Sequence, residues 1–222
     1  GNRASGSMVP TTPAYSPPPD EGLDIRYIDD ALLVVDKPAG LLSVPGRGAD
    51  KQDSLASRVQ ARYPGARVVH RLDMSTSGLL ALALDADIQR ALGRQFELRQ
   101  VDKRYVAVVA GRVADMERTI DLPLITDWPN RPRQIVDFVR GKPALTRLQV
   151  LAYAAAGDTT RVQLMPETGR SHQLRVHLQA IGHPILGDDL YAPPARLDQA
   201  PRLMLHAAFR ACTHPRSAMR LA

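Results

Sequence analysis

Residues 69–84 read VHRLDMSTSGLLALAL, a charged turn that runs into an apolar stretch. Nearly every residue from Gly78 to Leu84 is apolar, which is typical of a strand buried on both faces in the middle of a sheet. The turn before that strand carries Arg71 and Asp73. If the turn is extended there, both side chains point to one face, because strand parity repeats every two residues.

Strands and helices are predicted on both sides of this stretch. Six more apolar or alternating runs are typical of strands, at residues 31–35, 67–70, 105–110, 145–154, 161–165 and 203–212. Residues 86–99 place Ile88, Leu92 and Phe96 on one helical face, and further helices are expected at 171–181 and 54–63. Strands outnumber helices without regular alternation, so we predict an α+β fold, with a mixed, largely antiparallel sheet flanked by helices and loops.

Length and composition predict one folded domain. The 222 residues, 44% of them hydrophobic, suffice for one buried core. Residues 1–23 are rich in Pro, Ser, Thr and Gly without apolar periodicity, which predicts a disordered leader whose first seven residues resemble a cloning scar. The domain is expected at residues 24–222, and deleting residues 1–20 is expected to change little. The sequence has no apolar run of about 18 residues and no signal peptide. Neither membrane insertion nor secretion is therefore indicated.

Charge and cysteine content indicate the kind of binding partner and the cellular compartment to expect. The chain has 29 Lys and Arg against 23 Asp and Glu, a formal charge of +6. This excess suits a polyanionic partner such as RNA, although an ordinary basic surface gives the same count. The single cysteine, Cys212, excludes an intramolecular disulfide and a zinc site built on several thiolates, and it fits a reducing cytoplasm.

Motifs of several common enzyme classes are missing from the sequence. There is no phosphate-binding GxxxxGKS/T, no GxGxxG after a strand, no HExxH and no GxSxG. Nucleotide hydrolysis, nicotinamide redox chemistry, zinc proteolysis and esterase chemistry therefore lack support. His172 and His177 fall on different faces of a predicted helix, so we predict no metal site and interpret them as ordinary surface or capping histidines.

Taken by itself, Asp73 beside Arg71 in a Ser/Thr-rich turn is more typical of a structural ion pair or a turn cap than of a nucleophile. The wider motif changes this interpretation. Residues 70–80 (HRLDMSTSGLL) resemble the signature HRLDxxTSGLL of the RluA family of pseudouridine synthases, whose Asp is the catalytic residue. Three more segments resemble motifs of that family in the same order: residues 35–43 (VDKPAGLLS), 103–107 (KRYVA) and 167–175 (ETGRSHQLR).

The resemblance extends from about residue 25 to the end of the chain, since residues 121–124 (DLPL) and 183–188 (HPILGD) also fit. Residues 127–132 (DWPNRP) are most similar to a small family member that modifies both large-subunit ribosomal RNA and the anticodon stem-loop of transfer RNAs. Many relatives carry a small N-terminal RNA-binding domain, for which residues 1–23 are too short and too rich in Pro. The resemblance therefore implies an enzyme that selects structured RNA with its catalytic domain, as a monomer.

The chemistry that the resemblance implies needs no cofactor, because uridine and pseudouridine are isomers and nothing is oxidised. The family assigns the nucleophile to Asp73, the positive partner that offsets its desolvation to Arg170, and stacking on uracil, with a candidate role in moving the C5 proton, to Tyr105. Arg71 is expected to fill the space that the extruded base leaves. Five further basic residues are expected to contact phosphates: Lys37, Arg104, Arg131, Arg133 and Arg175.

Two other functions are compatible with parts of the sequence. A non-enzymatic RNA-binding or ribosome-assembly module would share the basic charge but would not need an acid at position 73. A glycosidase would also act at a sugar C1 atom, and it would need a second carboxylate near Asp73. Glu167 is the candidate for that second carboxylate.

Overall fold

The sheet that the apolar runs predict is present in the computed structural model, which describes residues 14–217 and 219–221. Among these residues, ten strands form one sheet. Eight of them follow the order β1 (Ile25–Ile28), β2 (Leu32–Lys37), β4 (Ser77–Ala83), β11 (Leu205–Thr213), β5 (Asp102–Ala110), β10 (Thr159–Pro166), β9 (Leu145–Ala154) and β6 (Glu117–Asp121). The other two are β3 (Arg67–Val68), which pairs with β4, and β12 (Arg220–Leu221), which pairs with β11. β4 and β11 are parallel, and the other pairs are antiparallel. The predicted α+β class with a mixed, largely antiparallel sheet is confirmed.

The strand β4 lies inside the sheet, between β2 and β11, as its apolar sequence predicts. Gly78 of this strand pairs with Ala207 of β11 and has a φ of 123°. A Cβ atom at this position would lie 2.4 Å from the backbone N and O atoms of Ala207. Glycine is therefore needed here for the sheet to form directly behind the turn that carries Asp73.

The helices lie where the periodicity predicts them. α1 (Leu55–Gln60), α2 (Ala86–Glu97) and α3 (Gln173–Ala180) fall within the three predicted ranges, and a short α4 follows at Pro194–Leu197. The carboxylate of Asp85 caps α2 by accepting a hydrogen bond from the Ile88 N–H. Ile88 and Leu92 are buried, while Phe96 stacks on His70 with ring centroids 4.5 Å apart.

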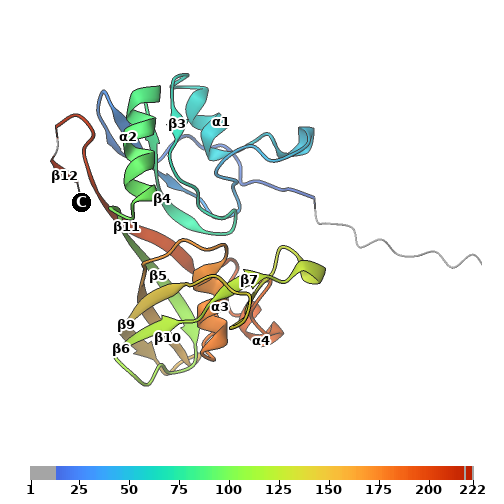
Figure 1. Cartoon of the computed structure of the whole chain (residues 1–222). Helices are drawn as coiled ribbons and strands as arrows, with labels where there is room; N and C mark the ends of the chain where they lie inside the picture. The colour runs from blue at the N-terminus through green and yellow to red at the C-terminus, as the bar shows by residue number, and fades with distance from the viewer. Residues whose placement is uncertain (1–13, 218, 222) are drawn as a thin grey trace, which may run out of the picture.

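The sheet and its helices divide into two halves (Figure 1). One half holds β1 to β4 with α1 and α2, and the other holds β6, β9 and β10 with α3 and α4. β5 and β11 run between the two halves. Each half has its own cluster of buried apolar side chains, around Leu80 in one and Leu164 in the other, and Tyr105 of β5 packs against both clusters. Tyr105 therefore lies at the junction of the two halves.

Residues 124–142 leave the sheet as a separate arm. The arm consists of β7 (Leu124–Thr126), the 3-10 turn η2 (Trp128–Asn130) and β8 (Gln134–Val136), and a bridge between Leu124 and Lys142 closes it. It extends from the body of the protein beside α3 (Figure 1), and β8 contacts that helix. Trp128 and Phe138 on the arm are 67% and 77% exposed. The arm thus presents aromatic side chains to solvent.

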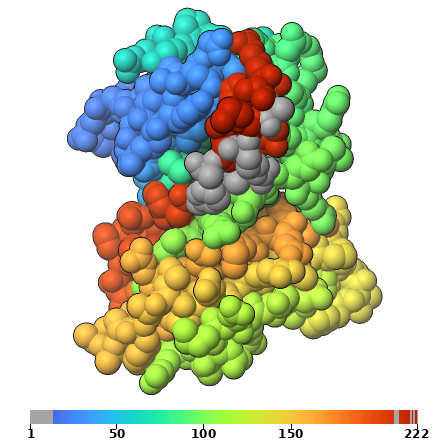
Figure 2. All heavy atoms as spheres, turned by 90° about the vertical axis from the view of Figure 1, so that its left-hand side faces the viewer, coloured from blue at the N-terminus to red at the C-terminus, as the bar shows by residue number. Residues whose placement is uncertain are grey.

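The C-terminal end of the described chain is anchored to the first strands. β12 pairs with β11, and Nε2 of His214 lies 2.8 Å from the carboxylate of Asp29 in the turn before β2. Arg216 forms a 3.0 Å ion pair with Asp30 in the same turn. Figure 2 shows these early (blue) and late (red) segments together on one face.

Residues 14–23 correct the predicted leader, because they bind to the body of the protein. The Tyr15 hydroxyl donates to the carbonyl of Asp53 and accepts from the N–H of Leu42, each at 2.9 Å. The Arg58 guanidinium donates to the carbonyl of Pro18. These side-chain contacts anchor a segment whose composition is typical of disorder, so the folded domain begins before residue 24. The predicted scar at residues 1–7 lies outside the described residues.

This anchored segment leads to a prediction about truncation. Deleting residues 1–20 should lower the free energy of unfolding by about 2–3 kcal/mol, since two or three part-buried hydrogen bonds at ~1 kcal/mol each are lost. Deleting only residues 1–13, which retains the contacts of Tyr15 and Pro18, is the matched control. Urea denaturation of both truncated proteins measures the difference. Equal midpoints would show that the contacts of Tyr15 and Pro18 contribute nothing.

Candidate active site

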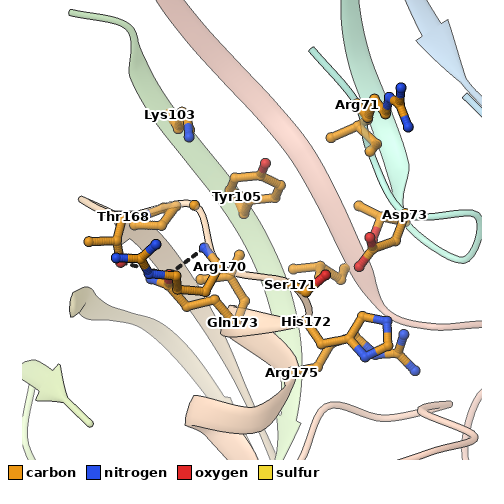
Figure 3. Close-up of a pocket in the computed structure, with 16 residues that line it drawn as sticks. Arg71, Asp73, Lys103, Tyr105, Thr168, Arg170, Ser171, His172, Gln173 and Arg175 are labelled. Carbon is orange, nitrogen blue, oxygen red and sulfur yellow. Dashed lines mark hydrogen bonds between the residues drawn. The ribbon is translucent and has the colours of Figure 1, made fainter. Parts of the chain in front are cut away.

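A pocket of about 320 Å³ opens between the turn before β4, the strand β5 and the loop that leads into α3. Four motif segments of the sequence supply or support its walls, although they are up to 140 residues apart. Of the predicted site residues, the pocket brings together five: Arg71, Asp73, Tyr105, Arg170 and Arg175 (Figure 3). The other four, Lys37, Arg104, Arg131 and Arg133, do not line it.

The turn that carries Asp73 is fixed on both sides of this residue. Leu72 is buried, and its N–H and C=O both bond to the hydroxyl of Ser43, at 3.0 and 2.6 Å. On the other side, the N–H of Thr76 donates to the carbonyl of Asp73 at 3.0 Å. The side chain of Asp73 itself is exposed to the pocket. A rigid backbone thus presents one carboxylate to any group that enters.

Arg71 and Asp73 are both exposed on either side of buried Leu72, as the strand parity predicts. Figure 3 shows the Asp73 carboxylate directed toward the Ser171 side of the pocket and the Arg71 guanidinium at the opposite rim. In the described part of the chain, no ion pair joins Arg71 to Asp73. The interpretation of these two residues as a structural ion pair is therefore not supported.

Lys37 lies beneath this turn and does not reach the surface. It is fully buried, and its ammonium donates to three carbonyl oxygens, those of Pro38, Leu41 and Met74, at 3.0, 2.6 and 3.1 Å. Burial lowers the pKa of Lys37 to about 7, and the negative charge of Asp73 acts in the opposite direction. The prediction that Lys37 contacts a phosphate is wrong, because the side chain holds the backbone next to Asp73 instead.

Arg175 is the second predicted phosphate contact that the structure corrects. It is 3% exposed, and its guanidinium forms a bidentate pair with the buried carboxylate of Asp188, with bonds of 3.0 and 2.6 Å. Burial acts to lower the pKa of Arg175, but the bond to Asp188 and the charges of Asp188 and Asp73 raise it. This permanently charged side chain lies in the field of Asp73.

Arg170, predicted to balance the charge of Asp73, is directed elsewhere in the structure. Its Nε donates to the carbonyl of Pro143 at 3.0 Å, and Figure 3 shows its guanidinium on the Thr168 side of the pocket, away from Asp73. Among the described residues no ion pair joins it to Asp73. The motif was identified correctly, but the arginine that faces Asp73 is the one five positions further on.

Gln173 holds the loop that leads into α3. Its side-chain oxygen accepts from the hydroxyl of Thr168 (2.7 Å) and from the N–H of Arg170 (3.1 Å). Its side-chain nitrogen donates to the carbonyl of Leu145 and the hydroxyl of Thr146. A buried amide whose oxygen and nitrogen are both fully bonded fixes the pocket wall.

His177 is part of the same buried network. Its Nδ1 lies 2.8 Å from the Thr146 hydroxyl and its Nε2 lies 2.9 Å from the carbonyl of Leu122. Burial lowers the pKa of this imidazole. The prediction that His177 is a surface or capping histidine is therefore wrong.

His172 lines the pocket and was not among the predicted site residues. It precedes α3 with a φ of 52°, so its backbone is left-handed and its ring turns toward Asp73. Nδ1 lies 2.7 Å from the Tyr191 hydroxyl. Burial lowers the pKa of His172 and the charge of Asp73 raises it. The position of His172 inside the arginine motif could have identified it as a site residue. The sequence does not indicate its partner Tyr191, which lies 19 residues further on.

The remaining predicted basic residues lie outside the pocket, on the arm and on β5. Arg131 stacks over the exposed Trp128 at 4.3 Å, and Arg133 stacks over Tyr191 at 5.4 Å. Arg104 lies 3.7 Å from Asp102. Because all three are at least partly accessible, contact with a polyanion is compatible with their positions.

Residues 14–217 and 219–221 contain no group of three or more His, Cys, Asp and Glu side chains that could hold a metal ion. Within the same residues, none of the helices has both the length and the apolar character that crossing a bilayer requires.

Comparison with known proteins gives the class of the fold and pocket. Residues 31–180 match the sequence model of RNA pseudouridylate synthases. The structure superposes on Human RNA Pseudouridylate Synthase Domain Containing 1 with a TM-score of 0.79 and 34% identity, covering 93% of this chain and 85% of that one. For Human RNA Pseudouridylate Synthase Domain Containing 4 the TM-score is 0.71 at 25% identity, over 89% and 85% of the two chains. The chain belongs to the RNA pseudouridylate synthase family, a class of isomerases.

Bacterial relatives are more similar in sequence. The chain is 54% identical over 201 residues to the dual-specificity RNA pseudouridine synthase RluA of Escherichia coli strain K12, which covers 90% of this chain and 91% of the relative. It is 52% identical over 202 residues to the enzyme of the same name from Pasteurella multocida, covering 91% and 92%. The predicted family is thereby confirmed.

Proposed function

We propose that this protein isomerises uridine to pseudouridine in structured RNA, in stem-loops of both large-subunit ribosomal RNA and transfer RNA, with Asp73 as nucleophile. The observation that carries the proposal is the pocket, in which one rigidly held carboxylate lies opposite Tyr105 and near buried Arg175. The names of the similar bacterial relatives support dual specificity. We expect a monomer, and the single free Cys212 suits a reducing cytoplasm.

The reaction breaks the bond from uracil N1 to ribose C1′, turns the base and joins C5 to C1′. In one route the Asp73 carboxylate attacks C1′ and displaces uracil as an anion, and C5 of the turned base then displaces the carboxylate. The proton lost from C5 is balanced by the one that N1 gains, so neither an oxidant nor a cofactor is consumed. Addition of Asp73 to the uracil ring, or removal of a sugar proton, are alternative first steps with the same residue.

The other pocket residues would bind the uridine and stabilise the charges. Tyr105 is half-buried between the two core clusters, which gives its ring a fixed place on which uracil can stack. Arg175 offsets the negative charge of Asp73. Arg71 at the rim can stack in the space of the extruded base, whose removal from the helix costs a few kcal/mol.

The arm offers a surface for the rest of the RNA. Arg131 and Arg133 supply positive charge, and the exposed rings of Trp128 and Phe138 can stack on unpaired bases. Arg104 on β5 is the further candidate for a phosphate contact. Contacts of this kind recognise shape and loop flexibility more than a long sequence.

The glycosidase alternative lacks its second carboxylate. Glu167 is exposed outside the pocket and pairs with Arg147 at 2.6 Å. A non-enzymatic RNA-binding module would not need the buried Arg175–Asp188 pair to lie near an exposed acid. Isomerisation is therefore the function that the geometry supports best.

Release of tritium from RNA labelled at uracil C5 tests the proposal. A stem-loop of transfer RNA and one of ribosomal RNA should both turn over at rates close to those of the intact RNAs. The same nucleotides in a perfect duplex should react at least about 10-fold more slowly, because extrusion then costs pairing as well as stacking. No release from either RNA would contradict the activity, whereas equal rates on the duplex would contradict recognition of a deformable loop.

A further inference from the structure

Tyr191 connects the arm to the catalytic pocket, although it lines neither the pocket nor the exposed surface of the arm. It is 4% exposed and follows the Asp188 carboxylate that holds Arg175. Two guanidinium groups lie over its ring, that of Arg133 at 5.4 Å and that of Arg175 at 5.2 Å. The first belongs to the arm and the second lies in the field of Asp73. A single aromatic ring thus contacts both regions.

The hydroxyl of Tyr191 also contacts both the arm and the pocket. Its oxygen accepts a 2.9 Å hydrogen bond from the N–H of Gln134 in β8. The same hydroxyl lies 2.7 Å from Nδ1 of His172, and the two rings meet edge to face at an angle of 80°. A backbone group of the arm is therefore joined through one phenol to an imidazole in the pocket.

The direction of these hydrogen bonds defines the form of His172. Burial raises the pKa of Tyr191 and lowers that of His172, so the phenol is protonated and the imidazole is neutral near pH 7. Because the Tyr191 oxygen already receives the Gln134 N–H, we assign the bond to His172 as donation from the Tyr191 hydroxyl to Nδ1. The remaining proton of the imidazole is then on Nε2, a donor that matches a carbonyl oxygen of uracil.

We propose that Tyr191 is a positioning residue that couples RNA binding by the arm to the catalytic pocket, by holding His172 and Arg175 in place beside Asp73. This inference rests on the proposed function. Gln134 and Arg133 on the arm hold the phenol, and the phenol holds His172 and Arg175 in the pocket, so RNA that contacts the arm acts on the pocket through Tyr191. Correct placement of these groups lowers the barrier only when all are present together.

The test compares two substitutions that each remove one hydroxyl. Tyr191→Phe retains the ring between the two guanidiniums and loses only the bonds to Gln134 and His172. Tyr153→Phe is the matched control, because that hydroxyl donates to Asp158 at 2.8 Å on an exposed part of β9, under a similar guanidinium of Arg112. Tritium release at saturating stem-loop RNA should fall about 10-fold for Tyr191→Phe, with KM within about twofold of wild type. Tyr153→Phe should behave as wild type.

A second readout separates coupling from loss of structure. Trp128 is the chain's one tryptophan and lies on the arm, so its fluorescence reports RNA binding by the arm alone. RNA should change its emission equally in wild type and in Tyr191→Phe, which shows that the arm still binds while turnover is slow. Thermal unfolding of each variant fixes a temperature at which both are folded.

A double substitution shows whether Tyr191 acts through His172. His172→Asn tolerates the left-handed backbone but lacks the ring. Adding Tyr191→Phe to it should cost less than about twofold, because the connection is already broken. A wild-type rate for Tyr191→Phe, a loss confined to KM, or independent losses in the double variant would each overturn the coupling. Absence of tritium release from the wild-type protein would instead overturn the proposed function itself.

Discussion

Asp73→Asn is expected to lose tritium release by on the order of 10⁴-fold or more, the scale on which removal of an essential nucleophile acts. The amide has nearly the same volume as the carboxylate. The turn is held by the Ser43 hydroxyl, which bonds to the backbone of Leu72, and by the Thr76 N–H, and neither involves the Asp73 side chain. An amide oxygen is a poor nucleophile toward C1′ or a uracil ring. Folding should therefore be unchanged while the reaction stops.

Binding is the internal control for this substitution. Affinity for RNA rests mostly on phosphate contacts, so it should stay within about threefold of wild type and fall equally steeply with added salt. Asp50→Asn, at an exposed carboxylate on the 3-10 turn η1 (Ala49–Lys51), is the matched substitution that should leave turnover intact. Clear residual turnover by a clean Asp73→Asn preparation would contradict the assignment of the nucleophile.

Local sequence patterns predicted the position of Asp73 and of the strand behind it. The apolar run after Gly78 places β4 inside the sheet, and the alternation around Leu72 leaves Arg71 and Asp73 exposed. Both features depend on residues close together in the chain. The same holds for α2, whose buried Ile88 and Leu92 follow from a spacing of four residues.

Contacts between residues that are distant in the chain could not be predicted from these local patterns. Lys37 has the sequence signature of a surface charge, but three carbonyls from two segments enclose it. Residues 14–23 have the composition of a disordered leader, but Tyr15 finds its partners 27 and 38 residues away. In each case a tertiary partner overrides the local signal, and no periodicity records it.

The prediction that Arg170, and not Arg175, balances the charge of Asp73 was wrong for a related reason. Both belong to the same motif, and the sequence alone does not show that His172 adopts a left-handed backbone just before α3. That turn changes the direction in which the following side chains point. The buried partner Asp188, 13 residues further along, then fixes Arg175 beside the pocket.

The correction from Arg170 to Arg175 gives the second large expected effect. Arg175→Met should reduce tritium release by about 10²–10³-fold, since one preorganised charge next to the reacting group is lost. It should also destabilise the fold by about 3–5 kcal/mol, because Asp188 is left as a buried charge without its partner. Arg170→Met should cost less than about 10-fold in rate and little stability, as its guanidinium bonds to a single carbonyl at Pro143.

Loss of stability and loss of catalysis can be separated with a compensated variant. Arg175→Met combined with Asp188→Asn removes both buried charges, and the asparagine oxygen can still accept from the N–H groups of Leu190 and Tyr191, which now bond to Asp188 at 3.1 and 3.2 Å. Most of the unfolding free energy should return, as expected when a buried ion pair is replaced as a whole. The rate should remain low, because Asp73 still lacks its cation. Urea denaturation and single-turnover tritium release, measured on the same preparations, give the two quantities. A double variant that regains the wild-type rate, or an Arg170→Met variant that loses as much activity as Arg175→Met, would show that the charge of Arg175 has no part in the reaction.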